Sequence, residues 1–449
     1  MKELSKNDLC NGEISGFTSE GAGVCRINDR AVFVPRTLPG ETWRVRIVKA
    51  NRTAVWGRGE ELLSAPSPDR IEPACPVFGK CGGCACLHMS YDAELRFKLG
   101  RVTDALRRIG GLTLVPDAIL GAENPVGYRN KAIYNYAPGP VCGFYRPRSH
   151  DVIAADACLL QPAEFHRAAA GLLDWMRSAG VPAYDERTGA GAVRRLFLRR
   201  GDSEMIACIV SARSLSGEVV PALREACPEL TGVLLCLNDR PGNTVLTSDI
   251  RTLWGKPTVE VTLSGTGFQL SPLTFFQVNA AQAERLYALA GQYAEPAGKL
   301  VLDLYCGAGS IGLTVARGAA RLLGNDVVPS AIENARRNAL ANGVTQAEYL
   351  CGDAAAVARK LAAGGLRPDV IITDPPRKGM DESVLAAMSE MGPERIVYIS
   401  CAPGTLARDL MRLRALGYEA EKCTAVDLFP RTPHVETVVL MTRTGAEKG

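Results

Sequence analysis

The sequence predicts an α/β protein in which a small β-barrel precedes a mostly parallel sheet that is covered by helices. Three observations carry this prediction. From residue 299 onward, apolar stretches of strand length alternate with helical segments, as in βαβ units. A glycine-rich turn, residues 307–312, directly follows the first of these strands. Between residues 10 and 62, short alternating strands are separated by glycine-containing turns, a pattern that predicts a closed barrel.

The elements follow from these patterns in chain order. Barrel strands are expected at 11–17, 20–28, 30–35, 38–50 and 53–62. The proline-rich residues 64–76 are typical of a linker, and the apolar periodicity of residues 95–111 predicts a helix that ends at glycine. The next segment, about 125–270, has mixed strands and helices.

The C-terminal strands are expected at 299–306, 320–327, 347–354, 368–376 and 395–401. A helix is expected at 329–343, and a closing hairpin over 418–444. With 449 residues the chain is long enough for several domains. We expect a barrel domain at 1–66, a central domain at 67–270 and a catalytic domain at 271–449.

Composition and charge limit where the protein works. The chain is 47% hydrophobic with a net charge of +4, and no apolar run is long enough to span a bilayer. The first ten residues have no apolar core, so we expect no membrane association and a reducing cytoplasm. There, the 15 cysteines are expected to be thiols and metal ligands rather than disulfides. Two basic stretches, 36–58 and 194–200, suit phosphate backbones.

The glycine-rich turn predicts a nucleoside-containing cofactor. Gly307, Gly309 and Gly312 fit the G-x-G-x-x-G pattern, which lets a ligand approach the backbone closely. Asp326 ends the next strand, where an acidic residue can bind ribose hydroxyls. The spacing alone leaves NAD open as the cofactor.

Two further strands end in residues that carry chemistry. Asp374 begins D-P-P after the fourth strand and is either a cleft residue or a turn or helix-capping residue. Cys401 ends the fifth strand, before a helix that we expect to start near Thr405 with its hydroxyl as the cap. A helix N-terminus lowers the pKa of a nearby thiol, so we expect a nucleophile there; an inert buried thiol is the alternative. His434 and Glu436 are candidate bases or loop-surface residues.

A cysteine-rich segment predicts a metal site. Cys75, Cys81 and Cys84 lie within ten residues that are rich in turn glycines. A fourth ligand is expected, and the candidates are Cys86, His88, Cys142 and Cys158. The spacing allows both zinc and an iron–sulfur cluster.

Taken together, these motifs resemble those of the RNA uracil-C5 methyltransferases, specifically the 23S rRNA 5-methyluridine enzymes that carry a TRAM domain. The resemblance covers nearly the whole chain. It rests on C-x5-C-x2-C followed by H-M-S-Y, F-F-Q-V-N, D-L-Y-C-G-A-G, D-P-P-R-K-G, S-C-x-P-x-T-L-A-R-D-L and F-P-x-T-x-H-V-E. Ser310, Asp326, Ala402 and Leu87 stand where the family more often has Asn, Glu, Asn and Gln.

The resemblance implies a Rossmann-like catalytic domain, a TRAM (OB-like) barrel that binds RNA and a central α+β domain with a 4Fe-4S cluster. The implied cluster ligands are Cys75, Cys81, Cys84 and Cys158. Residues implied around S-adenosyl-L-methionine and the target base are Gln277, Tyr305, Ser310, Asp326, Asp353 and Asp374. Cys401 would be the nucleophile and Glu436 the base.

The implied reaction is methylation of C5 of a uridine in RNA, with 23S rRNA favoured over tRNA and the enzyme monomeric. Addition of the Cys401 thiolate to C6 would activate C5. A nitrogen-directed methyltransferase of the D-P-P type is an alternative, and it would need no thiol. A cluster-bearing RNA-binding protein without catalysis is the other.

Overall fold

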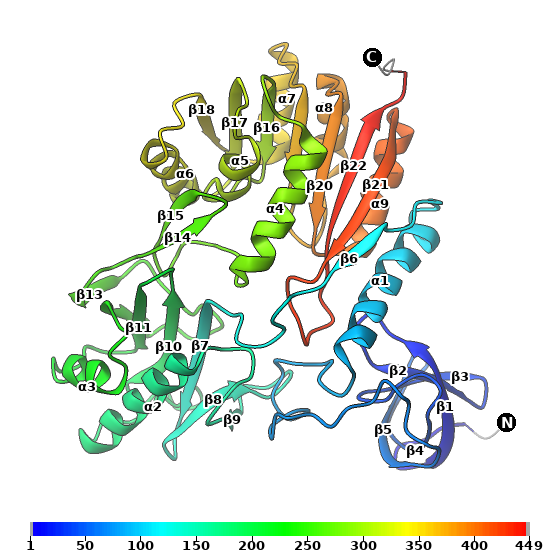
Figure 1. Cartoon of the computed structure of the whole chain (residues 1–449). Helices are drawn as coiled ribbons and strands as arrows, with labels where there is room; N and C mark the ends of the chain where they lie inside the picture. Colours follow the sequence, from blue (N-terminus) through cyan, green and yellow to red (C-terminus); the bar gives the residue numbers. More distant parts are fainter. Residues whose placement is uncertain (1–2, 446–449) are drawn as a thin grey trace.

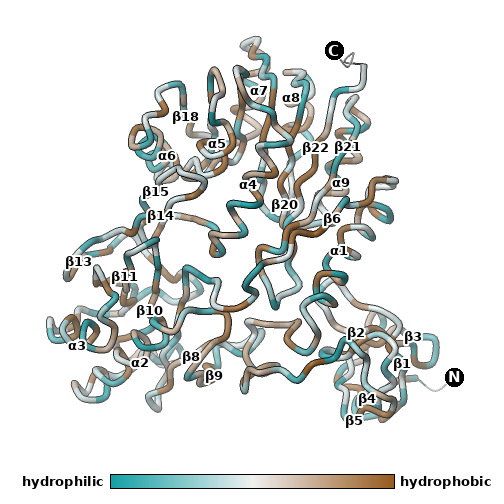
Figure 2. Tube along the Cα trace, viewed as in Figure 1, coloured by the Kyte–Doolittle hydropathy of each residue, from teal (hydrophilic) through white to brown (hydrophobic). Residues whose placement is uncertain are grey.

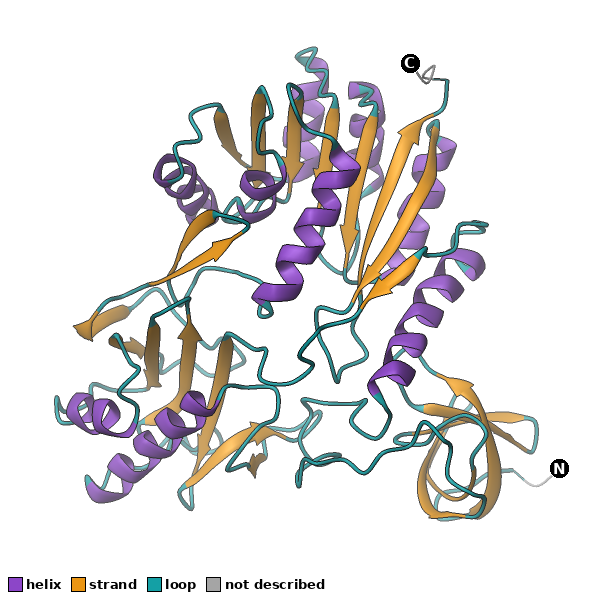
Figure 3. Ribbon diagram, viewed as in Figure 1, coloured by secondary structure: helices purple, strands orange, loops and turns teal. Residues whose placement is uncertain are grey.

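In this computed structural model, which describes residues 3–445, the chain begins with the predicted barrel (Figures 1 and 3). Its strands close in the order β1-β2-β3-β5-β4. Their bounds are β1 (Leu9–Phe17), β2 (Gly23–Ile27), β3 (Arg30–Val34), β4 (Thr42–Ala50) and β5 (Val55–Leu62). Alternate residues such as Ile14, Val32 and Val45 fill the interior. All five predicted strands are therefore confirmed, with ends that differ by a few residues.

The proline-rich stretch after the barrel is fixed to the barrel by a buried carboxylate. Glu41 is fully buried and accepts hydrogen bonds from Arg70 Nε at 2.6 Å and Arg70 Nη2 at 2.7 Å. Trp43 Nε1 and the backbone N–H of Leu38 also donate to it. A bidentate arginine pair of this kind has a defined geometry, so residues 64–76 dock against the barrel.

The central region is built on a seven-stranded sheet in the order β13-β12-β11-β10-β7-β8-β9. Its strands are β7 (Lys131–Ala137), β8 (Val141–Tyr145), β9 (Val152–Ala154), β10 (Val193–Arg200), β11 (Met205–Ser211), β12 (Gly232–Leu237) and β13 (Ile250–Gly255). The helices α2 (Ala163–Ser178) and α3 (Val219–Ala226) pack together beside it. A separate hairpin, β14 (Val259–Leu263) and β15 (Thr266–Leu270), leads to the C-terminal sheet.

The C-terminal sheet has eight strands in the order β18-β17-β16-β19-β20-β22-β21-β6. Its predicted strands are β16 (Leu300–Leu304), β17 (Arg321–Asp326), β18 (Ala347–Cys351), β19 (Val370–Thr373) and β20 (Arg395–Ser400), and they pair in parallel. The closing hairpin is β21 (Tyr418–Val426) and β22 (Glu436–Arg443). The predicted βαβ series and final hairpin are confirmed.

Helices cover both faces of this sheet. In Figure 1, α4 (Ala280–Ala294) crosses the near face, while α7 (Ala354–Ala363), α8 (Glu382–Met391) and α9 (Pro403–Ala415) lie behind it. The helices α5 (Ser310–Val315) and α6 (Pro329–Ala341) follow β16 and β17. Neighbouring strand residues face different cores: Val397 packs with the α4 side and Ile396 with the α9 side. Strands covered in this way are apolar along their length, and much of β20 and β22 is brown in Figure 2.

The segment between the barrel and the central sheet contributes to the C-terminal region. The helix α1 (Tyr91–Arg108) packs against α9, and β6 (Ala118–Leu120) pairs in parallel with β21. The predicted helix is thus present, four residues earlier at its start. The domain boundaries at 66/67 and 270/271 stay a prediction. Residues 91–120 pack with the C-terminal sheet, whereas the central sheet starts at Lys131.

Candidate active site

The carboxyl ends of the parallel strands form one edge of the C-terminal sheet, and this edge faces the barrel and central regions (Figure 1). The glycine-rich turn, Asp326, Asp374 and Cys401 each come directly at or after a strand end there. β22 runs antiparallel to β20 and starts at the same edge with Glu436. Ligands of open α/β sheets bind outside the carboxyl ends of the strands, so this edge is the candidate site.

The turn after β16 has a strained backbone that brings it close to Asp303. Tyr305, Gly307 and Gly309 all have positive φ, at 66°, 55° and 80°. At Gly312 the backbone N–H donates to Asp303 Oδ2 at 3.0 Å, and a Cβ there would lie 2.6 Å from the same oxygen. The third glycine of the motif is therefore required by close packing against Asp303, whereas the pattern had predicted a glycine that lets a ligand approach.

Asp303 itself is a buried acid in the sheet; it begins the D-L-Y-C-G-A-G motif of the resemblance but was not among the predicted site residues. Its side chain is 1% exposed, and Oδ1 has no hydrogen-bond partner among the described residues. Burial raises the pKa of Asp303 to about 8, and the nearby Asp374 and Asp326 raise it further. Its place four residues before Gly307, as the first residue of D-L-Y-C-G-A-G, is the signal that points to it.

Asp326 ends β17 and ties two loops together. Its Oδ2 accepts the backbone N–H of Gly307 at 3.0 Å, and its Oδ1 accepts that of Val328 at 2.8 Å. The adjacent Val327 is 63% exposed, an unusual state for a valine beside a turn that is otherwise packed. The structure thus gives Asp326 a role in shaping the turn and leaves an apolar surface next to it.

Cys401 and Glu436 lie at this edge on two neighbouring strands. The paired register of β20 and β22 ends at Ser400–Thr437, and Cys401 and Glu436 are the next residue on each side. Glu436 is 4% exposed, and Cys401 is half-buried. Directly opposed residues of an antiparallel pair have side chains on the same face, within contact distance.

Asp374 and Arg377 complete this cluster from the D-P-P loop. Burial raises the pKa of Cys401 to about 11; Glu436 and Asp374 raise it too, and Arg377 lowers it. Burial also raises the pKa of Asp374 to about 7, and burial together with Asp374 raises the pKa of Glu436 well above its usual range. The lowered thiol pKa predicted from the helix N-terminus is therefore wrong for this state, because burial and two acids outweigh it.

The helix after Cys401 begins earlier than predicted. α9 starts at Pro403, and Ala402 is its capping position without a side-chain cap. Thr405 is not the cap: its Oγ1 donates to the carbonyls of Arg377 at 3.0 Å and of Ala402 at 3.1 Å. Proline suits a first helical position, which explains the earlier start. Thr405 links the D-P-P loop to the loop of Cys401 instead.

Tyr287 on α4 lies at the centre of the candidate site, and the sequence did not single it out. It is buried, and its hydroxyl is 3.4 Å from Ser310 Oγ. Burial raises the pKa of Tyr287, with contributions from Asp374, Asp303 and Glu436. The tyrosine therefore lies near the acids of the glycine-rich turn and near the cluster around Cys401. The sequence offers little indication of Tyr287, because its place near the site depends on how α4 packs on the sheet.

The remaining predicted cofactor residues lie in separate places. Gln277 is buried in the loop before α4, and its backbone carbonyl accepts a hydrogen bond from Asn130 Nδ2 at 2.9 Å. Asp353 is exposed and caps α7 by accepting the N–H of Ala356 at 3.1 Å. Burial raises the pKa of Tyr305 to about 12, and the nearby Asp353 contributes. Asp353 is thus near enough to Tyr305 to act on it electrostatically, while no described contact joins Gln277 to Cys401.

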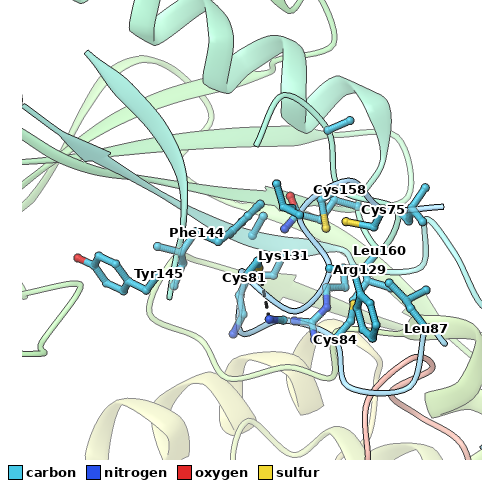
Figure 4. A pocket seen from close by; sticks show the side chains of 18 residues that line it. Cys75, Cys81, Cys84, Leu87, Arg129, Lys131, Phe144, Tyr145, Cys158 and Leu160 are labelled. Atoms are coloured by element: carbon cyan, nitrogen blue, oxygen red, sulfur yellow. Dashed lines mark hydrogen bonds between the residues drawn. The ribbon is translucent and has the colours of Figure 1, made fainter. Parts of the chain in front are cut away.

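The cysteines form a second candidate site, beneath the central sheet (Figure 4). Cys75, Cys81, Cys84 and Cys158 all line one cavity of about 290 Å³. Burial raises the pKa of Cys84 to about 12, and the three other thiols contribute. Among residues 3–445, no group of three or more His, Cys, Asp or Glu side chains is placed to hold a metal ion.

Of the four candidates for a fourth ligand, the cavity includes Cys158 alone. Cys86, His88 and Cys142 do not line it. His88 is buried and stacks on Phe78 at 5.9 Å between ring centroids. Arg129 and Lys131 also line the cavity and bring positive charge to it.

Neither predicted basic stretch is a plain cationic surface. In the barrel, Arg44 pairs with Glu61, and Arg46 pairs with Glu60 at 2.9 Å. In β10, the arginines are mostly buried and hold backbone or side-chain partners: Arg194 donates to Asn238 O at 3.0 Å and Arg199 to Ser271 O at 2.6 Å. Within the described residues, no helix is long and apolar enough to cross a membrane.

Comparison with known proteins identifies the family. Residues 258–444 match the family model tRNA (Uracil-5-)-methyltransferase. An uncharacterized RNA methyltransferase of Clostridium tetani is 38% identical over 99% of this chain and 98% of its own length. A second one, of Halalkalibacterium halodurans, is 38% identical over 98% of each chain. The structure of Pyrococcus abyssi tRNA (uracil-54, C5)-methyltransferase with S-adenosyl-L-homocysteine matches at TM-score 0.80 and 25% identity, covering 96% of this chain and 100% of that one.

The fold and these matches define a methyltransferase of the class that modifies RNA. More particularly, the chain belongs to the RNA uracil-C5 methyltransferase family.

Proposed function

We propose that this protein transfers a methyl group from S-adenosyl-L-methionine to C5 of a uridine in RNA, with Cys401 as the nucleophile and Glu436 as the base. The observation that carries the proposal is the proximity of Cys401 and Glu436 at the carboxyl edge of the sheet, beside Asp374. This reaction needs a thiol and acidic groups at the same sheet edge as the glycine-rich turn that would bind the cofactor.

The residues at the turn fit S-adenosylmethionine. The unpaired Asp303 Oδ1 and the exposed Val327 give the turn one polar and one apolar feature that a ligand can use. Each Asp326 oxygen accepts one N–H and keeps a second lone pair for a ribose hydroxyl. The residues that would hold the cofactor are Gln277, Tyr305, Ser310, Asp326, Asp353 and Asp374. When bound, it supplies an electrophilic methyl group on a sulfonium.

Cys401 makes C5 of the uracil nucleophilic. Its sulfur forms a bond to C6, and the electrons of the C5–C6 double bond move toward the O4 carbonyl. C5 of this enolate takes the methyl group. Glu436 then removes the C5 proton, the double bond re-forms, and the Cys401 thiolate leaves. A uridine inside a stack is out of reach, so the nucleotide must be flipped out to the sheet edge.

The charges around Cys401 bear on two steps: addition of the Cys401 sulfur to C6 and removal of the C5 proton. At neutral pH the thiol is protonated, because its pKa is about 11. Arg377 favours the thiolate, and the carboxylates oppose it. Burial and the nearby Asp374 raise the pKa of Glu436 well above its usual range, which makes its carboxylate a stronger base for the C5 proton. Asp374 also lies near Cys401 and can take the thiol proton, so Glu436 stays free to accept the C5 proton.

We further propose that Cys75, Cys81, Cys84 and Cys158 hold a 4Fe-4S cluster. The four thiols share one cavity, and Arg129 Nε is a buried donor without a partner beside it. Each thiolate of a cluster binds a different iron, so the four sulfurs lie further apart than the ligands of a single ion. Such spacing is compatible with the lack of a single-ion site among residues 3–445. Two cations offset the negative charge of such a cluster. Anaerobic purification is expected to give a brown protein with iron and sulfide; a colourless protein with zinc would contradict this assignment.

The favoured substrate is 23S rRNA, because a barrel that suits RNA is combined with a cysteine cavity. A tRNA substrate is the second candidate, and the full-length match to the Pyrococcus abyssi tRNA enzyme favours it. A nitrogen-directed methyltransferase would need no thiol at Cys401.

The experiment that tests the proposal incubates the protein with labelled S-adenosylmethionine and either rRNA or tRNA, and then analyses the nucleosides by mass spectrometry. We expect 5-methyluridine at one or two rRNA positions. Cys401→Ala should abolish it, and Cys351→Ala, at an exposed thiol outside the cluster, should not. Activity of Cys401→Ala, or a methylated nitrogen as product, would overturn the proposal.

A further inference from the structure

The strand that begins with Glu436 is preceded by a loop with no regular secondary structure. Residues 427–435 connect β21 to β22 and cross the carboxyl edge of the sheet. A loop of this kind does not fix its own geometry, so its carbonyls and amides must be held from outside. The contacts of this loop, here called the Glu436 loop (residues 427–435), show where that support comes from.

A buried lysine of α1 holds the start of the Glu436 loop. Lys98 Nζ donates to Asp427 Oδ1 at 2.6 Å, to Glu94 Oε1 at 2.6 Å and to the carbonyl of Phe429 at 3.2 Å. These three bonds use all three protons of the ammonium group. The side chains of Lys98, Glu94 and Asp427 are all fully buried.

The partners of Lys98 extend the support along the loop. Glu94 Oε1 also accepts the backbone N–H of Arg431 at 2.7 Å. Tyr91 OH, from the first turn of α1, donates to Asp427 Oδ2 at 2.7 Å. The helix therefore grips both ends of the stretch 427–431 through one group of buried charges.

Other elements hold the loop at single points. Tyr128 OH donates to the carbonyl of Pro430 at 3.0 Å, and Arg101 donates to that of Pro433. The backbone N–H groups of Ala85 and Cys86 donate to the carbonyl of Arg431 at 3.1 and 3.2 Å. The Tyr128 and Arg101 bonds are partly buried, and α4 adds buried neutral bonds from Asn279 and Gln282, whereas the group around Lys98 consists of fully buried charges.

Resting on the proposed role of Glu436 as the base, we propose that Lys98 is a positioning residue that sets Glu436 against the C5 proton. A buried charge that loses its partner is strongly destabilising, so the network around Lys98 allows the loop one arrangement. The step that depends on Glu436 is removal of the C5 proton. Addition of Cys401 and transfer of the methyl group both precede it and do not use Glu436 as the base. A displaced loop should therefore slow proton removal selectively.

The test separates these steps with RNA that contains ordinary [5-³H]uridine. Release of tritium reports removal of the C5 proton, and a protein–RNA species that survives denaturation reports the methylated Cys401 adduct. Lys98→Met should slow tritium release by about tenfold or more while single-turnover methyl incorporation changes by less than about threefold, so the adduct accumulates. Tyr128→Phe removes one hydroxyl and keeps the fold. It should show the same pattern as Lys98→Met, slower tritium release with accumulated adduct, by a smaller factor.

The matched control is Arg395→Met. Arg395 donates to the carbonyl of Tyr293 at 3.1 Å and to Glu295 at 2.7 Å, and it lies at the start of β20, at the opposite edge of the sheet. It bridges a carbonyl and a carboxylate as Lys98 does, and we expect no adduct from it. Thermal unfolding of each variant establishes that it is folded at the assay temperature.

Two results would overturn the proposal for Lys98: an equal loss of methyl incorporation and tritium release with no adduct in Lys98→Met and Tyr128→Phe, or rates for both variants that match those of Arg395→Met. Glu436→Gln tests the underlying function separately. It should accumulate the adduct on its own; if it does not, Glu436 is not the base, whatever Lys98 does.

Discussion

Cys401 directly follows β20 and Glu436 begins β22, each one residue beyond the last recorded pair of these antiparallel strands, Ser400–Thr437. This register brings together a thiol that follows a strand and a carboxyl that begins one, from places 35 positions apart in the sequence. Burial raises the pKa of the thiol, the nearby Glu436 and Asp374 raise it further, and Arg377 lowers it. A covalent methylation mechanism needs this pair and little else from the sheet edge.

The pKa of Cys401 should respond in opposite directions to two substitutions. Asp374→Asn removes a negative neighbour and should lower the pKa, while Arg377→Met removes a positive one and should raise it. Only the thiolate is alkylated, and below a pKa of about 11 the rate should rise about tenfold per pH unit. Iodoacetamide labelling of the Cys401 peptide, followed by mass spectrometry between pH 7 and pH 10, measures it.

At a fixed pH we expect the order of labelling rates Asp374→Asn, wild type, Arg377→Met, from fast to slow. The exposed Cys351 serves as an internal control, and its labelling should be the same in all three proteins. The reverse order would mean that the charges around Cys401 differ from those described.

Gly312→Ala should disturb the nucleoside turn. The new Cβ would lie 2.6 Å from Asp303 Oδ2, which is closer than real contacts of this kind allow. Overpacking of this sort destabilises by roughly 1–3 kcal/mol, and the turn carries the proposed cofactor residues. Isothermal titration with S-adenosyl-L-homocysteine should show affinity weakened by at least about tenfold. Gly16→Ala, in an open position of β1, is the control that should leave the affinity unchanged.

The barrel should lose part of its attachment in acid. Arg70 and other donors hold the pKa of Glu41 at about 2, below its ordinary value, although burial opposes them. For a lowered acid pKa, the stabilisation is present above the unfolded-state value and is lost as pH falls toward the folded-state value. It amounts to roughly 3 kcal/mol near neutral pH.

Denaturant unfolding of wild type and Glu41→Gln at several pH values checks this prediction. The difference in free energy of unfolding between the two should fall by more than half from pH 6 to pH 3. A difference that stays constant over this range would show that the Glu41 carboxylate does not titrate as described.

Loss of the cysteine site should be transmitted to the Glu436 loop. Ala85 and Cys86 donate to the carbonyl of Arg431, and both lie next to the proposed cluster ligand Cys84. Cys84→Ser, or treatment with a chelator that would remove the proposed cluster, should therefore raise hydrogen exchange of the non-proline amides of residues 85, 86 and 427–435 by at least about tenfold. Amides in the middle of α9 should keep their protection; general loss of protection would indicate unfolding instead.

Strand alternation was enough to predict the barrel and the βαβ series, because one-sided burial and two-sided burial leave different patterns. The buried arginines of β10 were misread as a basic surface. The sequence shows the charge of Arg194, but it does not show that the backbone carbonyl of Asn238 is its partner. Likewise the window 36–58 stopped just before Glu60 and Glu61, which pair with its arginines.

The candidate site was predictable in its strand ends but not in its register. The motifs place Asp374 and Cys401 at one sheet edge by the rule for parallel strands. Which residue of β22 meets Cys401 depends on the pairing of β20 with β22, and the sequence does not show this pairing. β6 was missed for a similar reason, since a strand of three residues that pairs with β21 from 300 positions away has little local signal. Tyr287 and Lys98 are equally silent, because they act through helices packed on the sheet.

The central claim is a covalent bond between Cys401 and C6 of the target uracil. RNA made with 5-fluorouridine tests it directly, because fluorine does not leave C5 as a proton does and the methylated adduct cannot break down. With S-adenosylmethionine and wild-type protein, we predict a stable conjugate whose RNA-bearing peptide contains Cys401, and none with Cys401→Ala. No conjugate with the wild-type protein, or an equal yield from Cys401→Ala, would contradict the mechanism.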